Sequence, residues 1–314
     1  MIINVCALYI KIMNNENQTI HKSDDNLTIY GWNEKLNQLK QESIYSTLAH
    51  GRVSIVHRTC YEVISGNGLF QCELTGNMMY GKSDDELPCT GDWVIFQPFD
   101  EHKGIIVDSL PRERPVYRKK SGAVADKQAI ASYVDKAFIV QSLDDNFNVR
   151  RVERFMVQIM EENISSVLVL NKADLDFDRQ SVEEQIKHIS SQIPVFFTSI
   201  HQLETIVRLR KSISEGETVV FVGSSGVGKS SLVNALCEKP VLLTSDISLS
   251  TGKGRHTSTR REMVLMDSSG VLIDTPGVRE FGLAIDNPDS LAEVLEISDY
   301  AELCRFKDCK HINE

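Results

Sequence analysis

Short β-rich runs alternate with turn signals along the chain from Gly51 to about Arg112. The runs are GRVSIVHR, CYEVI, LFQCELTG, DWVIFQPF and KGIIVDSL, and the turn-forming segments SGNG, GKSDDELPCTG and DEHKG separate them. Five short β-rich runs separated by turn signals rich in Gly, Asp and Ser are typical of strands joined by turns. We therefore expect a small all-β barrel over residues 51–112, of the oligonucleotide-binding (OB) type. A barrel with only a structural role fits the pattern nearly as well.

The pattern changes after residue 136, where continuous apolar runs alternate with helical segments. These runs are AFIV at 137–140, SVLVL at 166–170, IPVFF at 193–197 and TVVFV at 218–222. Strands that lack polar alternation are buried on both faces, as in a parallel sheet covered by helices. The pattern predicts an α/β domain over residues 137–285. Residues 113–136, which contain Pro, Arg, Lys and Ser and show little periodicity, are expected to form a linker or flexible loop.

A length of 314 residues allows about two domains, and 41% hydrophobic and 25% charged residues are ordinary for a globular protein. The seven cysteines are odd in number and scattered, which argues against a disulfide framework and predicts a cytoplasmic protein. Residues 1–50 are expected to be a lead-in. Its apolar stretch Met1–Ile10 is about half as long as a membrane helix, so we expect an extra strand or a frayed terminus and no membrane contact.

The net charge of −10 does not favour a nucleic-acid partner, because Lys and Arg supply the phosphate contacts that dominate affinity. Basic clusters nevertheless occur at 112–120, 150–154 and 253–261. Since such runs are more often solvated surface than binding patches, composition alone leaves an RNA-binding role open.

The strongest chemical signal is the segment GSSGVGKSS at 223–231, which follows the strand TVVFV and precedes the helical pattern SLVNALCEK. It matches GxxxxGK[ST], in which glycines let the backbone wrap a phosphate and amide hydrogens point at it. Lys229 would neutralise the β- and γ-oxygens and act in catalysis, and Ser230 would hold Mg²⁺. The predicted phosphate-binding residues are Gly223, Ser224, Ser225, Gly226, Val227, Gly228, Lys229, Ser230 and Ser231.

A phosphate loop does not identify the base, but NKAD at 171–174 follows the buried strand SVLVL and matches the guanine-reading pattern NKxD. A carboxylate at Asp174 can accept from N1 and the exocyclic amine of guanine, whereas adenine lacks this pair of donors. Asn171 would tie loops together and the Lys172 stem would cover the base. The nucleotide-binding set also includes Ala173. One strand later, Thr198 and Ser199 are expected to bring a backbone amide to guanine O6.

Two further segments complete the expected site. Asp274 and Gly277 form a DxxG element about fifty residues after the phosphate loop. The Asp274 carboxylate would belong to the Mg²⁺ shell, and the Gly277 amide would sense the γ-phosphate. Between the phosphate loop and the DxxG element, the segment GKGRHTSTR at 252–260 has the composition of a switch loop. Thr257 and Thr259 are candidate Mg²⁺ ligands, and Ser258 remains an alternative.

Hydrolysis needs a group that places water, and Val278, which follows the DxxG element, cannot do so. His256 in the switch loop is our candidate catalytic residue, although a solvated histidine fits the sequence about as well. We expect slow intrinsic turnover that rises when a partner orders this loop.

The motif order is circularly permuted, because the base reader precedes the phosphate loop and the DxxG element. A parallel sheet tolerates such a rearrangement, since strands pair by their position in space. Whatever follows the DxxG element is then tied covalently to the γ-phosphate sensor. Residues 286–314 begin a C-terminal module with Cys304, Cys309 and His311 at a spacing that suits Zn²⁺, and the chain ends at Glu314 before a fourth ligand. An open site, a chance cluster and a truncated structural zinc site all fit this pattern.

The order NKAD, TS, GSSGVGKSS, GRHTST, DTPGVREFG and CRFKDCKH resembles the ribosome small subunit-dependent GTPase A family of bacterial ribosome biogenesis factors over nearly the whole chain. The segment GVREFGL is particularly specific. The resemblance implies a late maturation factor that binds the 30S subunit and its 16S rRNA, hydrolyses GTP when stimulated by it, and then leaves. It also implies zinc on Cys304, Cys309 and His311, with a further cysteine of the family lying beyond this sequence, and it matches His256 to the family's switch-loop histidine.

Two hypotheses of different class follow. The first is a Mg²⁺-dependent GTPase that uses GTP, releases GDP and works as a monomer on the 30S particle. The second is a nucleotide-dependent RNA-binding switch whose hydrolysis is incidental. An ATPase of another phosphate-loop class is disfavoured by NKAD.

Overall fold

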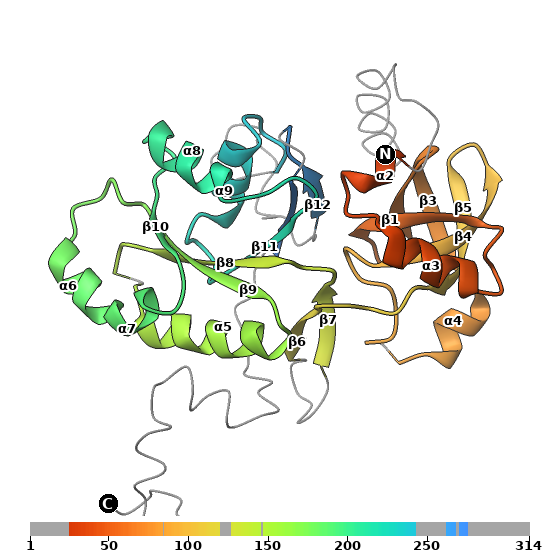
Figure 1. Cartoon of the computed structure of the whole chain (residues 1–314), viewed down its shortest axis with the longest axis horizontal. Helices are drawn as coiled ribbons and strands as arrows, with labels where there is room; N and C mark the ends of the chain where they lie inside the picture. Colours follow the sequence, from red (N-terminus) through yellow and green to blue (C-terminus); the bar gives the residue numbers. More distant parts are fainter. Residues whose placement is uncertain are drawn as a thin grey trace, which may run out of the picture.

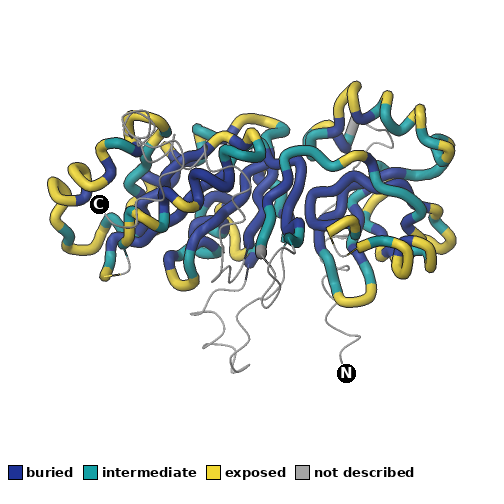
Figure 2. Tube along the Cα trace, turned by 90° about the horizontal axis from the view of Figure 1, so that it is seen from below, coloured by how far each residue is buried: buried dark blue, intermediate teal, exposed yellow. Residues whose placement is uncertain are grey.

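The computed structural model describes residues 25–83, 85–119, 127–145, 147–242, 262–267 and 270–275. A small barrel lies beside a larger sheet that carries helices on both faces (Figure 1). Figure 2 shows that buried residues follow the strands through both parts, whereas exposed residues gather at the outer loops and helices. In the described part of the chain, no helix is long and apolar enough to cross a membrane.

The barrel is built from the five runs expected to be strands. Its spatial order is β1-β2-β3-β5-β4, and β4 pairs back onto β1 to close it. All pairings are antiparallel except β3 with β5. A short helix, α4 (Gly76–Gly81), connects β3 to β4. The strands are β1 (Ala49–Val56), β2 (Tyr61–Ser65), β3 (Gly68–Leu74), β4 (Trp93–Asp100) and β5 (Lys103–Ser109).

Strand β4 is buried on both faces, which explains why its sequence WVIF does not alternate. Val94 and Phe96 point into the barrel core. Trp93 and Ile95 point outward, where part of the expected lead-in covers them. That part comprises α2 (Asp25–Thr28) and α3 (Glu34–Glu42), which supply Leu27, Trp32 and Leu36 to the same cluster.

The larger sheet has the order β10-β9-β8-β11-β13-β12. Its strands run parallel except β12, which is antiparallel to β13. The four apolar runs expected here form strands, as does GVLI before Asp274, whereas β12 was not expected. The strands are β8 (Lys136–Ser142), β9 (Ser165–Asn171), β10 (Val195–Phe197), β11 (Thr218–Val222), β12 (Glu262–Leu265) and β13 (Val271–Asp274).

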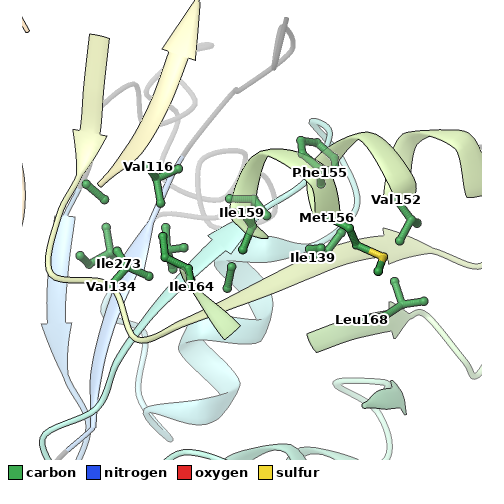
Figure 3. Packing of buried hydrophobic residues seen from close by; sticks show 14 of the residues in the cluster. Val116, Val134, Ile139, Val152, Phe155, Met156, Ile159, Ile164, Leu168 and Ile273 are labelled. Carbon is green, nitrogen blue, oxygen red and sulfur yellow. The ribbon is translucent and has the colours of Figure 1, made fainter. Parts of the chain in front are cut away.

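Helices cover this sheet on two sides (Figure 1). On one side, Phe155 and Met156 of α5 pack with Ile139 and Leu168 of the strands (Figure 3). On the other, residues of α8 and α9 pack with alternate positions such as Phe138. This double burial is what the continuous apolar runs require. The helices are α5 (Val149–Glu161), α6 (Arg179–Gln185) and α7 (Lys187–Ser190) on the first side, and α8 (Leu203–Lys211) and α9 (Lys229–Leu236) on the second.

The segment expected to be a linker or flexible loop instead contains two paired strands. Strands β6 (Val116–Lys119) and β7 (Lys127–Ala131) form an antiparallel pair. Val116 is buried against the α5 side of the sheet, and Gln158 of α5 donates to the Tyr117 carbonyl at 2.7 Å. The strands were missed because their few apolar positions stand among charged and polar residues, and packing on α5 stabilises them.

Two arginines of the expected basic cluster at 112–120 form ion pairs within the protein. Arg112 binds Asp92 at 2.6 Å and Arg114 binds Asp135 at 2.9 Å. Arg112 thus pairs with the barrel and Arg114 with the residue before β8, so both charges already have partners within the fold.

Arg52 of β1 joins the barrel to the sheet at the start of β11. Its side chain is buried, and Nη1 donates to Thr218 Oγ1 at 3.0 Å. Burial lowers the pKa of Arg52 to about 10, an effect that Asp135 opposes, so the guanidinium stays charged at neutral pH. Its other hydrogen bonds go to the carbonyl oxygens of Tyr30, Gly91, Ser132 and Tyr133.

Candidate functional site

The phosphate-loop segment lies between the carboxyl end of β11 and the first residue of α9. Gly223, Gly226 and Gly228 have φ values of +151°, +84° and +93°, in the region that favours glycine. A Cβ atom on Gly223 would lie 2.3 Å from the Val140 carbonyl oxygen. The glycines therefore permit a backbone that turns sharply and packs directly on the neighbouring strand.

Lys229 is buried within this loop. Its Nζ donates to the carbonyl oxygens of Gly223 at 2.8 Å and Ser224 at 2.9 Å. Burial lowers the pKa of Lys229, and the nearby Asp274 carboxylate opposes that effect. The ammonium is thus held inside the loop by backbone oxygens, close to where a phosphate would lie.

Ser230 and Asp274, both expected to serve Mg²⁺, are in contact. Ser230 Oγ donates to Asp274 Oδ2 at 2.7 Å. The other carboxylate oxygen, Oδ1, is buried and has no hydrogen-bond partner within the residues that the structure describes. Burial raises the pKa of Asp274, so a cation beside it would stabilise the ionised form. A hydroxyl and an unsatisfied carboxylate oxygen fit a hard cation such as Mg²⁺.

The base-reading segment meets the phosphate loop through Asn171. Its Nδ2 donates to the Val227 carbonyl at 2.8 Å, and Thr198 Oγ1 donates to its Oδ1 at 3.4 Å. Asn171 is 3% exposed, so these contacts hold a buried amide between loops from different strands. The three segments at 171–174, 198–199 and 223–231 therefore lie at one edge of the sheet.

Asp174 stands at the open side of this edge. Its side chain is exposed, and Oδ1 accepts from Ser199 Oγ at 2.5 Å. This hydrogen bond lowers the pKa of Asp174, which keeps the carboxylate ionised at neutral pH. The Ala173 amide donates to the Thr198 carbonyl at 2.9 Å, which fixes the two segments to each other. An ionised, accessible carboxylate can accept two donors from a ligand.

The structure adds one residue that the sequence analysis did not identify. Asp144 Oδ2 accepts from Lys172 Nζ at 2.8 Å. No sequence pattern marks this aspartate, because its role depends on the turn after β8 lying beside the end of β9.

Several expected site residues lie outside the described residues. These are the candidate catalytic histidine, the candidate switch-loop ligands, the DxxG glycine and the proposed zinc ligands. Among the residues that are described, no group of three or more His, Cys, Asp or Glu side chains is arranged to hold a metal ion. The residues outside the description are His256, Thr257, Thr259, Gly277, Cys304, Cys309 and His311.

The arrangement as a whole places a glycine loop with a buried ammonium beside a carboxylate and hydroxyl pair, next to an exposed carboxylate. These groups suit a phosphate chain, a divalent cation and a base with adjacent donors. Among the described residues, this geometry suits positioning of a ligand and stabilisation of negative charge.

Comparison with known proteins gives consistent matches. A family model described as RsgA GTPase matches residues 109–284. Over 302 residues the chain is 73% identical to small ribosomal subunit biogenesis GTPase RsgA 1 of Bacteroides thetaiotaomicron, covering 96% of this chain and 83% of that relative. A second relative, small ribosomal subunit biogenesis GTPase RsgA of Methanosarcina acetivorans, is 37% identical over 313 residues, with coverages of 96% and 82%.

Two solved structures share the fold. YjeQ from Thermotoga maritima aligns with a TM-score of 0.61 and 24% identity, over 85% of this chain and 87% of that one. YloQ, described as a circularly permuted GTPase, aligns with a TM-score of 0.57 and 20% identity, over 87% of each chain. The expected architecture, an OB-like barrel followed by a circularly permuted P-loop domain, is confirmed.

Proposed function

Because the chain belongs to the RsgA GTPase family and is a GTP hydrolase, we propose that it binds the small ribosomal subunit and hydrolyses GTP during late maturation of that particle, with the particle as activator. The relatives at 73% and 37% identity carry the description of small ribosomal subunit biogenesis GTPases, which supports this assignment. We further propose that the protein works in the cytoplasm as a monomer.

The observation that carries the nucleotide part is the hydrogen bond from Asn171 to Val227. It supports a single pocket in which the phosphate loop binds the triphosphate and the segment at 171–174 binds the base. In this pocket Asp174 accepts hydrogen bonds from the guanine edge. The segment of Thr198 and Ser199 supplies a backbone amide to guanine O6.

Hydrolysis is assigned mainly to charge stabilisation and positioning. The loop amides and Lys229 bind the oxygens of the transferred phosphoryl group, where charge grows in the transition state. Ser230 and Asp274, with Thr257 or Thr259, would hold Mg²⁺, which supplies further charge neutralisation when bound. Gly277 would contact the γ-phosphate through its amide.

His256 is proposed to place the attacking water, because Val278 cannot accept or donate a hydrogen bond through its side chain. Substitution His256→Ala should lower the hydrolysis rate at saturating GTP and leave GDP affinity unchanged. Single-turnover hydrolysis together with GDP titration measures both quantities. An unchanged rate would assign water placement to another group.

The barrel is proposed to contact RNA, since its closed OB-like order is a common scaffold for oligonucleotide binding. Zinc is proposed on Cys304, Cys309 and His311, which would add a structural module after the GTPase domain. Metal analysis of this chain, beside one extended by the relatives' following residues, tests the zinc site. Metal in neither protein would leave the cysteines without that role.

Single-turnover hydrolysis with and without 30S subunits tests the main proposal. We expect a faster rate with subunits, and co-sedimentation with them that is stronger with a nonhydrolysable GTP analogue than with GDP. A nucleotide-dependent association with an unchanged rate would instead favour the RNA-binding switch. Equal affinity for GTP and ATP would defeat the guanine assignment.

A further inference from the structure

Asp144 connects the end of a buried strand to the base-reading segment. It lies in the turn between β8 and α5, and its two carboxylate oxygens have different partners. Oδ2 accepts from Lys172 Nζ at 2.8 Å, and Oδ1 accepts from Ser142 Oγ at 2.7 Å. Since Ser142 is 1% exposed at the end of β8, one oxygen is fixed to the core while the other holds the lysine.

The backbone fixes this turn against the base-reading segment. Ser142 and Asn171 are partners in the parallel register of β8 and β9. Directly after them, the Leu143 amide donates to the Asn171 carbonyl at 2.9 Å, and the Phe147 amide donates to the Asp144 carbonyl at 2.9 Å. The carboxylate therefore has a defined position relative to the residue before Lys172.

Lys172 itself is held in an unusual conformation. Its φ is +61°, in the left-handed region that residues other than glycine seldom adopt. Its side chain is 35% exposed and that of Asp144 is 24% exposed, so the pair lies at the margin of the site. A free lysine side chain loses conformational entropy when a ligand packs against it, and an anchored one has already lost that freedom.

We propose that Asp144 is a positioning residue for guanine nucleotides: it anchors the Lys172 ammonium so that the lysine stem forms one wall of the site for the purine ring whose edge Asp174 binds. The inference rests on the proposed guanine site and adds a residue to it. Asp144 acts through Lys172, which lies in the base-reading segment, so we expect it to affect binding of the base and not the reacting phosphate.

Substitution Asp144→Asn keeps the size of the side chain and removes its charge. GDP and GTP should both bind about fivefold more weakly, the scale of one charge-assisted contact near the surface. The hydrolysis rate at saturating GTP should stay unchanged, because binding is lost equally from the ground state and the transition state. A role in the overall stability of the domain would not separate affinity from rate in this way.

Calorimetric titration of the full chain with GDP, and with ADP as the comparison, tests the proposal. Asp145→Asn is the matched control, because Asp145 is the exposed neighbour and loses the same charge. It should bind GDP like the unmodified protein. Lys172→Met keeps an apolar stem without the ammonium, and in that background Asp144→Asn should have no further effect.

Two results would overturn the inference. One is GDP affinity in Asp144→Asn equal to that of the unmodified protein, and the other is full additivity with Lys172→Met. Equal binding of GDP and ADP by the unmodified protein would instead remove the guanine site itself. The melting temperature of each variant shows whether it is folded, and Lys172→Met supplies the second measurement if Asp144→Asn is not.

Discussion

The side chain of Asn171 fills the space that a Cβ atom at Gly228 would need. Asn171 Nδ2 donates to the Val227 carbonyl at 2.8 Å, and a Cβ on Gly228 would lie 2.4 Å from the same nitrogen. Two loops that are 56 residues apart along the chain therefore fit together only because one of them has no side chain at this point.

Alanine at Gly228 should damage nucleotide binding far more than alanine at Gly226. Both glycines have positive φ, but a Cβ on Gly226 meets nothing within 4 Å. Gly226→Ala should therefore show only backbone strain of about 1 kcal/mol. Gly228→Ala adds the clash with Asn171. In GDP titrations its loss of affinity should be at least about tenfold greater than that of Gly226→Ala, which corresponds to roughly the free energy of one misplaced buried polar group. Equal losses in the two variants would argue against the close fit.

Asp174→Asn should exchange the base preference of the site. An amide cannot accept from both guanine donors, so GDP affinity should fall by at least about tenfold. The new amide hydrogen suits the C2 carbonyl of xanthine, so affinity for xanthosine diphosphate should rise. Competition titrations of GDP, ADP and xanthosine diphosphate measure the change, and an unaltered preference would remove Asp174 from base recognition.

Titration of Asp174 should not weaken GDP binding in mild acid. The hydrogen bond from Ser199 lowers the pKa of this carboxyl, so the charged form persists as pH falls and is lost only below its ordinary range. Titrations between about pH 8 and about pH 5.5 should then show no loss attributable to this group. In Ser199→Ala the pKa should return toward its ordinary value, and any weakening would begin at a higher pH.

Arg52→Met should strongly destabilise the protein. The change leaves Thr218 Oγ1 and several buried carbonyl oxygens without their donor, at a cost of roughly 3 kcal/mol or more. Urea unfolding followed by circular dichroism measures this loss. Arg58→Met is the matched control, because Arg58 is exposed in the bend between β1 and β2, and the free energy of unfolding of this variant should differ by less than about 0.5 kcal/mol.

Alkylation should distinguish Cys60 from the buried cysteines of the described chain. Burial raises the pKa of Cys72 to about 12 and that of Cys237 to about 11, and it also raises the pKa of Cys89. These thiols stay protonated at pH 8.5, whereas alkylation needs the thiolate. Peptide mapping after native treatment with iodoacetamide should find Cys60 modified and the other three intact until the protein is unfolded.

The sequence predicted the barrel strands, strands β8 to β11 and the glycine loop after β11, because each depends on local pattern. TVVFV followed by GSSGVGKSS describes a buried strand, a glycine loop and a helix within neighbouring residues, and the structure contains these three in that order. The barrel strands could be predicted in the same way, because short β-rich runs stand between turn-forming segments. The site roles of Asp174, Lys229 and His256 remain predictions until ligands are tested.

Features that depend on contacts between residues far apart in the chain could not be predicted from local sequence pattern. Strands β6 and β7 have little apolar pattern of their own and pack against α5 through Val116 and Gln158. Asp144 meets Lys172 only because β8 and β9 are neighbours in the sheet. Arg52 resembles any surface arginine in the sequence, and only the folded chain shows that it reaches Thr218, 166 residues away.

The buried guanidinium of Arg52 has a consequence for how the chain can be divided. Removing the barrel would leave Thr218 Oγ1 and the carbonyls of Ser132 and Tyr133 facing solvent, and it would also expose the edge of β12 that pairs with Ile55. The GTPase domain therefore depends on its own barrel: joined to a different domain, it would need a replacement hydrogen-bond donor for Thr218 at the start of β11.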